Sequence, residues 1–147
     1  MLKGISPLIS PQLLATLCEM GHGDRIVLAD AHFPGSSTNP RVVRADGLKI
    51  TDLLQGILPL FELDSYVDDA ALMMAPVEGD TADPEIRSQY ENLIARYSTE
   101  SLPILEVERF AFYEMAAQAF AVVMTGDTAK YGNLIITKGV TPSNNLT

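Results

Sequence analysis

Apolar residues recur along the chain in short blocks, and the spacing within a block indicates its secondary structure. The first block has apolar residues three and four positions apart, at Leu13, Leu14, Leu17 and Met20. Ser10 and Pro11 precede it, and these residue types suit the cap and the first position of a helix. Gly21 can supply the left-handed residue that ends a helix. The pattern therefore predicts a helix between Pro11 and Gly21.

Two further blocks have helical spacing, and a third segment is rich in alanine. One block runs from Ile50 to Phe61, and Pro59 is expected to kink this helix or end it early. The other runs from Ile86 to Tyr97 and follows Asp83-Pro84, a second pair of capping residue and proline. The alanine-rich segment predicts a fourth helix over about Phe112 to Gln118.

Short apolar runs lie between these helices. Most are apolar on both faces, as in strands that are covered on both sides, and they are found at Ile26–Ala29, Val42–Val43, Leu72–Met74, Phe120–Met124 and Leu134–Ile136. Another strand is expected around Leu105 and Val107, and it is expected to end at Arg109. The segment from Pro34 to Pro40 is rich in Gly, Ser, Asn and Pro and is expected to be a loop.

Strands that alternate with helices indicate an α/β fold with helices on both faces of the sheet. We expect a three-layer α/β/α arrangement around a mostly parallel, mixed sheet of about six strands. No internal repeat, low-complexity tract or linker interrupts the pattern. Residues 1–147 are therefore expected to form one domain.

The charge balance narrows the range of partners. The chain has a net charge of −9 at pH 7, and its ten Lys and Arg residues are scattered rather than clustered. This argues against nucleic-acid binding and against binding to an anionic membrane surface, and it leaves small molecules and other proteins. No apolar run approaches the ~18 residues of a membrane span. The lone Cys18, expected to be buried, cannot form an internal disulfide, and no signal-peptide pattern is visible, so a cytoplasmic location is expected.

Gly21-His22-Gly23-Asp24 is the segment whose pattern most suggests chemistry. Two glycines flank a histidine in the expected turn between a helix and a buried strand. Such a turn can present an imidazole at a cleft, and histidine suits proton transfer near neutral pH. An exposed turn histidine without a function would have the same pattern. Spacing alone leaves both interpretations open.

Asp30 follows the first buried strand, and His32 lies two residues later. Ligands of α/β sheets bind beyond the carboxyl ends of strands, where a carboxylate can accept hydrogen bonds from hydroxyl groups. A helix-capping or turn aspartate is the alternative. No third ligand lies at a familiar metal-binding spacing from His22, Asp30 and His32, so no metal is expected. Nucleotide-binding glycine motifs, nucleophile elbows and Cys-x-x-Cys pairs are absent from the sequence.

Two more segments contain candidate binding residues. Arg109, at the expected end of a strand, can contact a ligand or form a surface ion pair. Tyr131-Gly132-Asn133 precedes the last strand; tyrosine offers an amphipathic wall, and asparagine both donates and accepts hydrogen bonds. This second segment can equally be a turn without a ligand.

The sequence resembles the RbsD/FucU family of cytoplasmic sugar mutarotases over nearly its whole length, and most closely the fucose branch of that family. The resemblance is carried by Ser10-Pro11 with Leu13-Leu14, Met20–Asp24, Ile26–Pro34, Arg44–Gly47, Arg109–Glu114, Lys130–Leu134 and Lys138–Val140. The ribose branch usually has threonine in place of Gly23, a histidine near Arg109, and alanine in place of Gly132.

The resemblance implies an isomerase that interconverts the α and β anomers of L-fucose without a metal or an organic cofactor. It implies that His22 is the proton donor and that the sugar is bound by Asp30, Arg109, Tyr131, Gly132 and Asn133. It also implies a homodecameric ring in which adjacent subunits complete the sites. Phe110, Phe112 and Tyr113 are candidate interface aromatics, or else core residues. The alternatives are a D-ribose pyranase of the same family and a monosaccharide-binding module without catalytic activity.

Overall fold

The apolar runs form the six strands of one sheet in the computed structural model, which describes residues 1–146. The strands are β1 (Arg25–Ala29), β2 (Val42–Ala45), β3 (Ala71–Met74), β4 (Ile104–Val107), β5 (Ala121–Thr125) and β6 (Leu134–Thr137). Their order across the sheet is β2-β5-β1-β6-β3-β4. β6 runs antiparallel to both of its neighbours, and every other pairing is parallel. The predicted mixed, mostly parallel sheet is confirmed.

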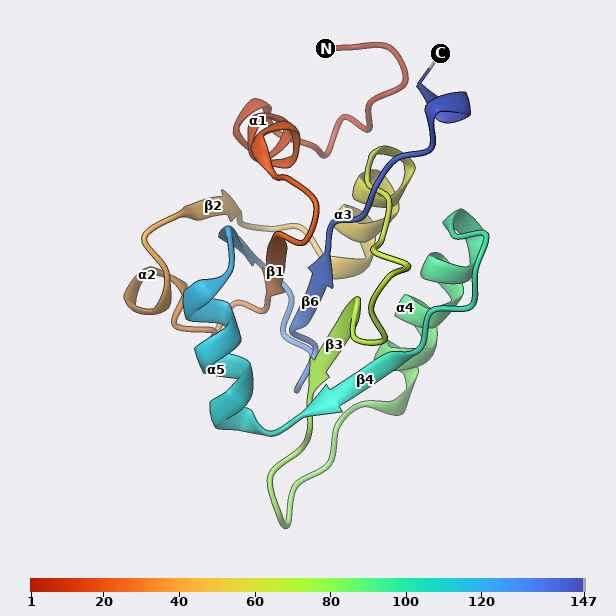
Figure 1. The fold of residues 1–147 in the computed structure, drawn as a ribbon. Helices are drawn as coiled ribbons and strands as arrows, with labels where there is room; N and C mark the ends of the chain where they lie inside the picture. The colour runs from red at the N-terminus through yellow and green to blue at the C-terminus, as the bar shows by residue number, and fades with distance from the viewer. Residues whose placement is uncertain (147) are drawn as a thin grey trace.

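Helices cover both faces of this sheet (Figure 1). The helices are α1 (Pro11–Glu19), α2 (Gly35–Thr38), α3 (Ile50–Ile57), α4 (Pro84–Tyr97) and α5 (Arg109–Gln118), with 3-10 turns at Leu58–Leu60 and Ser143–Asn145. Buried residues of α1, α3 and α4 pack on one face, and those of α2 and α5 pack on the other. This is the expected three-layer α/β/α architecture.

The alternation of side chains along each strand produces two separate apolar cores. On β1, Ile26 and Leu28 belong to the core under α1, α3 and α4, whereas Val27 and Ala29 belong to the core under α5. All four side chains are fully buried. Since both faces of the strand are covered, the run had to be apolar throughout, as the sequence pattern indicated.

The helix-start signals act as expected. The Ser10 hydroxyl accepts a hydrogen bond from the Leu13 N–H at 3.1 Å, and the Asp83 carboxylate accepts one from the Glu85 N–H at 3.0 Å. Each bond satisfies an N–H group that has no partner inside its helix. α3 ends at Ile57, and the chain continues as a 3-10 turn through Pro59.

Arg109 does not end a strand. β4 stops at Val107, and Arg109 is the first residue of α5, which starts earlier than the expected position near Phe112. The cause is Glu108, whose carboxylate accepts hydrogen bonds from the N–H groups of Phe110 and Ala111 at 2.9 and 3.1 Å. This cap begins the helix ahead of its alanine-rich part.

Two smaller expectations were also wrong. The segment 34–40 contains the short helix α2, in which the Thr38 hydroxyl donates to the Pro34 carbonyl at 2.7 Å. Cys18 is exposed rather than buried, because the buried residues of α1 are Leu13 and Leu17 and the cysteine falls on another side of the helix.

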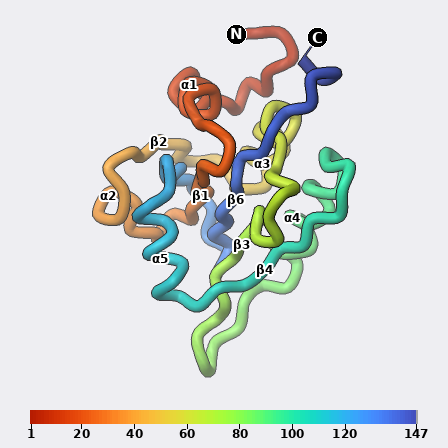
Figure 2. The backbone as a smooth tube through the Cα atoms, viewed as in Figure 1, coloured from red at the N-terminus to blue at the C-terminus, as the bar shows by residue number. Residues whose placement is uncertain are grey.

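The backbone tube shows that the two termini lie at one end of the molecule (Figure 2). The loop 75–83, between β3 and α4, extends from the opposite end. Within the described part of the chain, no helix has the length and apolar character needed to cross a membrane.

Candidate functional site

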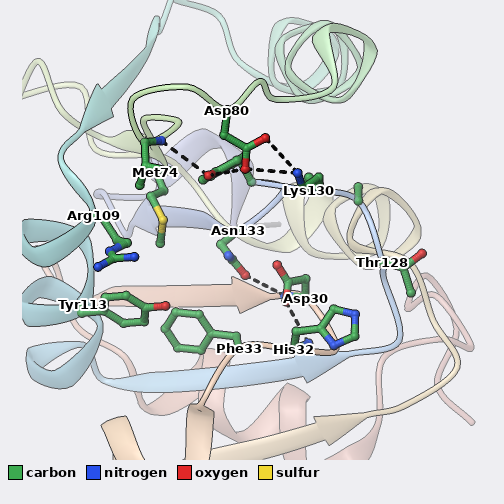
Figure 3. A pocket seen from close by; sticks show the side chains of 13 residues that line it. Asp30, His32, Phe33, Met74, Asp80, Arg109, Tyr113, Thr128, Lys130 and Asn133 are labelled. Carbon is green, nitrogen blue, oxygen red and sulfur yellow. Dashed lines mark hydrogen bonds and ion pairs between the residues drawn. The ribbon is translucent and has the colours of Figure 1, made fainter.

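An open cavity of about 280 Å³ lies at one end of the sheet (Figure 3). It is lined by Asp30, His32, Phe33, Met74, Val77, Asp80, Arg109, Tyr113, Thr128, Ala129, Lys130, Tyr131 and Asn133. These residues follow the carboxyl ends of β1, β3, β4 and β5, or precede the amino end of the antiparallel β6. The cavity therefore occupies the place where α/β sheets bind ligands, and its size suits a small molecule.

Asp30 and Asn133 join two neighbouring strands at the base of this cavity. The Asn133 side-chain carbonyl accepts the Asp30 backbone N–H at 2.7 Å, and one Asp30 carboxylate oxygen accepts the His32 N–H at 2.9 Å. Asp30 is thus a turn aspartate and a cavity residue at once. Its second carboxylate oxygen and the Asn133 amide group are left to accept from and donate to a ligand.

Arg109 and an aromatic wall form another side of the cavity. Among residues 1–146, no carboxylate lies within ion-pair distance of Arg109, so the ion-pair interpretation is not supported. The Phe33 and Tyr113 rings stack with centroids 5.4 Å apart. A charged donor beside aromatic faces suits a ligand with both hydroxyl groups and apolar C–H surface.

Tyr131 forms a third side, together with the loop after β3. Its hydroxyl donates to the Asp80 carboxylate at 2.9 Å, and the Lys130 ammonium donates to both oxygens of the same carboxylate at 2.8 and 3.1 Å. Lys130, the Thr81 N–H and the Tyr131 hydroxyl together lower the pKa of Asp80 to about 2. The carboxylate is therefore ionised at neutral pH.

Gly132 is fixed by a hydrogen bond from a buried tyrosine of α4. The Tyr90 hydroxyl donates to the Gly132 carbonyl at 2.6 Å, and Tyr90 is fully buried. Burial, with a smaller effect of the charges on Asp127 and Asp30, raises the pKa of Tyr90 well above its ordinary value. The phenol thus stays protonated and fixes the turn that carries Tyr131 and Asn133.

His22 lies at the other end of the sheet, outside this cavity. It precedes β1, whereas Asp30 follows β1, and the four steps from Arg25 to Ala29 alone span about 13 Å. One copy of the chain therefore brings Asp30, Arg109, Tyr131 and Asn133 together around the cavity, with Gly132 in the same turn, but it does not bring His22 to them.

His22 has a well-defined setting of its own. Its Nε2 lies 3.2 Å from a carboxylate oxygen of Asp64; the Asp64 side chain is only 4% exposed, while that of His22 is 49% exposed. The other Asp64 oxygen accepts the Tyr66 N–H at 3.0 Å. The Tyr66 ring, 79% exposed, lies with its centroid 5.7 Å from that of His22. The imidazole is thus oriented by a buried acid and open to a ligand.

The turn around His22 is fixed by backbone contacts. Gly23 has a φ of 88°, which favours glycine, and its N–H donates to the Lys138 carbonyl at 2.8 Å. The Lys138 ammonium donates to the carbonyls of Leu17 and Met20 at the end of α1. Gly23 thus forms the turn that carries His22, and the imidazole is half exposed at that turn.

Sequence reasoning missed Asp64 and Asp80. Asp64 meets His22 only through tertiary structure and follows no recognisable element. Asp80 did carry a signal, because it lies in an acidic loop after a predicted strand, where α/β proteins place ligand contacts. In residues 1–146, no group of three His, Cys, Asp or Glu side chains is arranged to hold a metal ion.

Comparison with known proteins gives a consistent result. Residues 3–141 match the model of the RbsD / FucU transport protein family. The fucose mutarotase of Streptococcus pneumoniae, solved in complex with L-fucose, is 46% identical, with a TM-score of 0.91 over 96% of this chain and 100% of that one. FucU of Bifidobacterium longum is 45% identical, with a TM-score of 0.91 over 95% and 100%. RbsD of Bacillus subtilis, complexed with D-ribose, shares only the fold, at 22% identity and a TM-score of 0.75 over 97% and 100%.

Proposed function

The chain belongs to the RbsD/FucU family, and on that basis we propose that it is an L-fucose mutarotase. Such an enzyme is an isomerase that interconverts the α and β anomers of the sugar. Two fucose-branch structures share 45–46% of its residues over nearly the whole chain, and one of them holds L-fucose. The ribose-bound relative is far more distant, so D-ribose is the weaker candidate substrate.

The cavity chemistry supports a monosaccharide as the ligand. Asp30 offers a free carboxylate oxygen, and Arg109 and the Asn133 amide offer donors, all around one open space. Phe33 and Tyr113 add apolar surface for the C–H side of a sugar ring. A neutral polyol needs this mixture of acceptors, donors and aromatic surface.

Mutarotation requires two proton transfers around one bond cleavage. The ring oxygen gains a proton, the anomeric hydroxyl gives one to Asp30, Tyr131 or a bound water, and the bond between the anomeric carbon and the ring oxygen breaks to give an open-chain aldehyde. After rotation of the carbonyl group, closure on its other face reverses both transfers. Each well-placed acid or base contributes about 10²- to 10⁴-fold to such a reaction.

We assign the donation to the ring oxygen to His22, and we assign sugar binding to Asp30, Arg109, Tyr131, Gly132 and Asn133. Because His22 and this cavity lie at opposite ends of β1, the assignment requires two copies of the chain, one of which supplies His22 to the cavity of the next. The half-exposed imidazole and the exposed Tyr66 and Phe110 rings support such a contact. The decameric ring and the cytoplasmic location implied by the family resemblance stay predictions.

Mixing two inactive variants tests the shared site. His22→Ala and Arg109→Ala are each expected to lose activity, and co-refolded mixtures are expected to regain part of it, because some interfaces then combine an intact His22 with an intact Arg109. Co-refolded His22→Ala, Arg109→Ala double mutant is the matched control and should stay inactive. If the mixtures regain no activity, a site built from two chains is contradicted. Native mass spectrometry would measure the number of subunits in the assembly.

Saturation-transfer NMR on equilibrated L-fucose tests the function itself. We expect wild-type protein to accelerate magnetisation exchange between the two anomers of L-fucose. The acceleration with L-fucose should exceed the acceleration with D-ribose. An exchange rate equal to that of buffer would overturn the proposed function. His22→Ala is expected to reduce the acceleration about 10²- to 10⁴-fold, and an unchanged rate would remove only the role assigned to His22.

A further inference from the structure

Tyr131 occupies a backbone conformation that needs support. Its φ is 57°, and among residues 1–146 it is the only non-glycine residue with a positive φ. A bulky side chain in this region is strained, and such strain persists only where the surroundings hold it in place. The turn places the ring against the cavity.

Asp80 supplies part of that support from the loop after β3. Its carboxylate accepts the Tyr131 hydroxyl at 2.9 Å and is itself clamped by the Lys130 ammonium and the Thr81 N–H. Figure 3 shows the Asp80 carboxylate and the Lys130 ammonium pointing toward each other. All of Asp80, Lys130 and Tyr131 line the cavity, so the clamp is part of its wall.

The direction of this hydrogen bond has a chemical consequence. A phenol carries one proton, and an ionised carboxylate can only accept, so the proton of Tyr131 points to Asp80. The Val77 N–H donates to the same phenol oxygen over a long 3.4 Å. The oxygen therefore has a lone pair, rather than a proton, left for a molecule in the cavity.

We propose that Asp80 is a positioning residue of the sugar site, which fixes Tyr131 with its phenol oxygen as the acceptor for a sugar hydroxyl. The inference rests on the proposed mutarotase function. Asp80 needs no contact with the sugar. It acts by holding the Tyr131 ring in place and by occupying its only donor, so that the site selects a ligand that donates at this point.

A double-mutant cycle tests the inference. Asp80→Asn and Tyr131→Phe are each expected to raise KM for L-fucose about tenfold, the value of one hydrogen bond, and to change kcat far less. Because Asp80 acts through Tyr131, adding Asp80→Asn to Tyr131→Phe should cause little further change. Glu78→Gln, which removes a charge from the same exposed loop, is the matched control and should behave as wild type.

Three results would overturn the inference: effects of Asp80→Asn and Tyr131→Phe that multiply in the double variant, an Asp80→Asn variant equal to Glu78→Gln, or no recovery in Asp80→Glu, which retains a carboxylate. Should Asp80→Asn fail to fold, Lys130→Met tests the same clamp, with a smaller expected rise in KM. Wild-type protein that does not accelerate anomer exchange would overturn the mutarotase proposal itself. If wild-type protein accelerates exchange but the effects of Asp80→Asn and Tyr131→Phe multiply in the double variant, only the role of Asp80 is overturned.

Discussion

The imidazole Nε2 of His22 lies 3.2 Å from the carboxylate of Asp64, although the two residues are 42 positions apart in the sequence. The carboxylate is almost completely buried, and the imidazole is half exposed. This contact uses Nε2 and leaves Nδ1 as the ring nitrogen open to a ligand. Under the proposed function, this buried acid would fix both the orientation of the ring and the nitrogen that faces the sugar.

We expect Asp64→Asn to lower the anomer-exchange rate about 10- to 100-fold, since a charge-assisted hydrogen bond to the histidine is lost. The measurement is saturation-transfer NMR with L-fucose. Asp68→Asn, an exposed acid in the same segment, should leave the rate unchanged. In the His22→Ala background, Asp64→Asn should have no further effect, and a further loss there would show that Asp64 acts independently of His22.

Tyr90→Phe is expected to lower the free energy of unfolding by about 1–3 kcal/mol, because the buried Gly132 carbonyl loses its donor. Urea unfolding followed by circular dichroism measures this. Tyr97→Phe removes a hydroxyl from the exposed end of the same helix and should change stability little. Equal stabilities of the two variants would contradict a structural role for the Tyr90 hydroxyl.

The Asp80 carboxyl is expected to titrate near pH 2 rather than near 3.8. Because its pKa is lowered in the folded state, its contribution to stability is complete above about pH 4 and is lost as the pH falls toward 2. Carbon-detected NMR of the aspartate carboxyl groups measures the midpoint. Lys130→Met should move the midpoint upward, and a wild-type midpoint close to 3.8 would contradict the clamp.

Gly139→Ala is expected to destabilise the fold by about 1–3 kcal/mol through steric overlap. A Cβ there would lie 2.6 Å from the Leu63 carbonyl oxygen and 2.8 Å from the Asp64 Cα, both backbone atoms. The variant should also slow anomer exchange, since it displaces Asp64, whose carboxylate contacts His22. Gly21→Ala, whose Cβ would meet its nearest neighbour at an ordinary 3.7 Å, is the control for stability. A Gly139→Ala protein as stable and active as wild type would show that this segment can move freely.

The elements of the fold were predictable because local signals and burial agree. Ser10 and Asp83 cap helices where expected, and β1, whose residues are apolar on both faces, lies in the centre of the sheet. The failures have a local cause as well. Glu108 is an unusual cap for a helix, so Arg109 was assigned to the preceding strand instead of the first turn of α5.

The candidate site was predictable only in part. Asp30 and Arg109 could be named as candidates because they follow strands, and the carboxyl ends of parallel strands meet at one edge of a sheet. Tyr131 and Asn133 reach the same edge only because β6 is antiparallel, and no local pattern indicates the direction of a strand. The separation of His22 from the cavity, and its pairing with Asp64, depend on tertiary packing that spacing does not encode.

The reversed direction of β6 also limits how the chain can change. Asn133 immediately precedes this four-residue strand and Lys138 immediately follows it, so one short segment anchors the cavity at one end and the His22 turn at the other. A one-residue insertion or deletion in β6 would turn its side chains to the opposite faces and shift one of these anchors. We therefore expect this strand to tolerate no change of length.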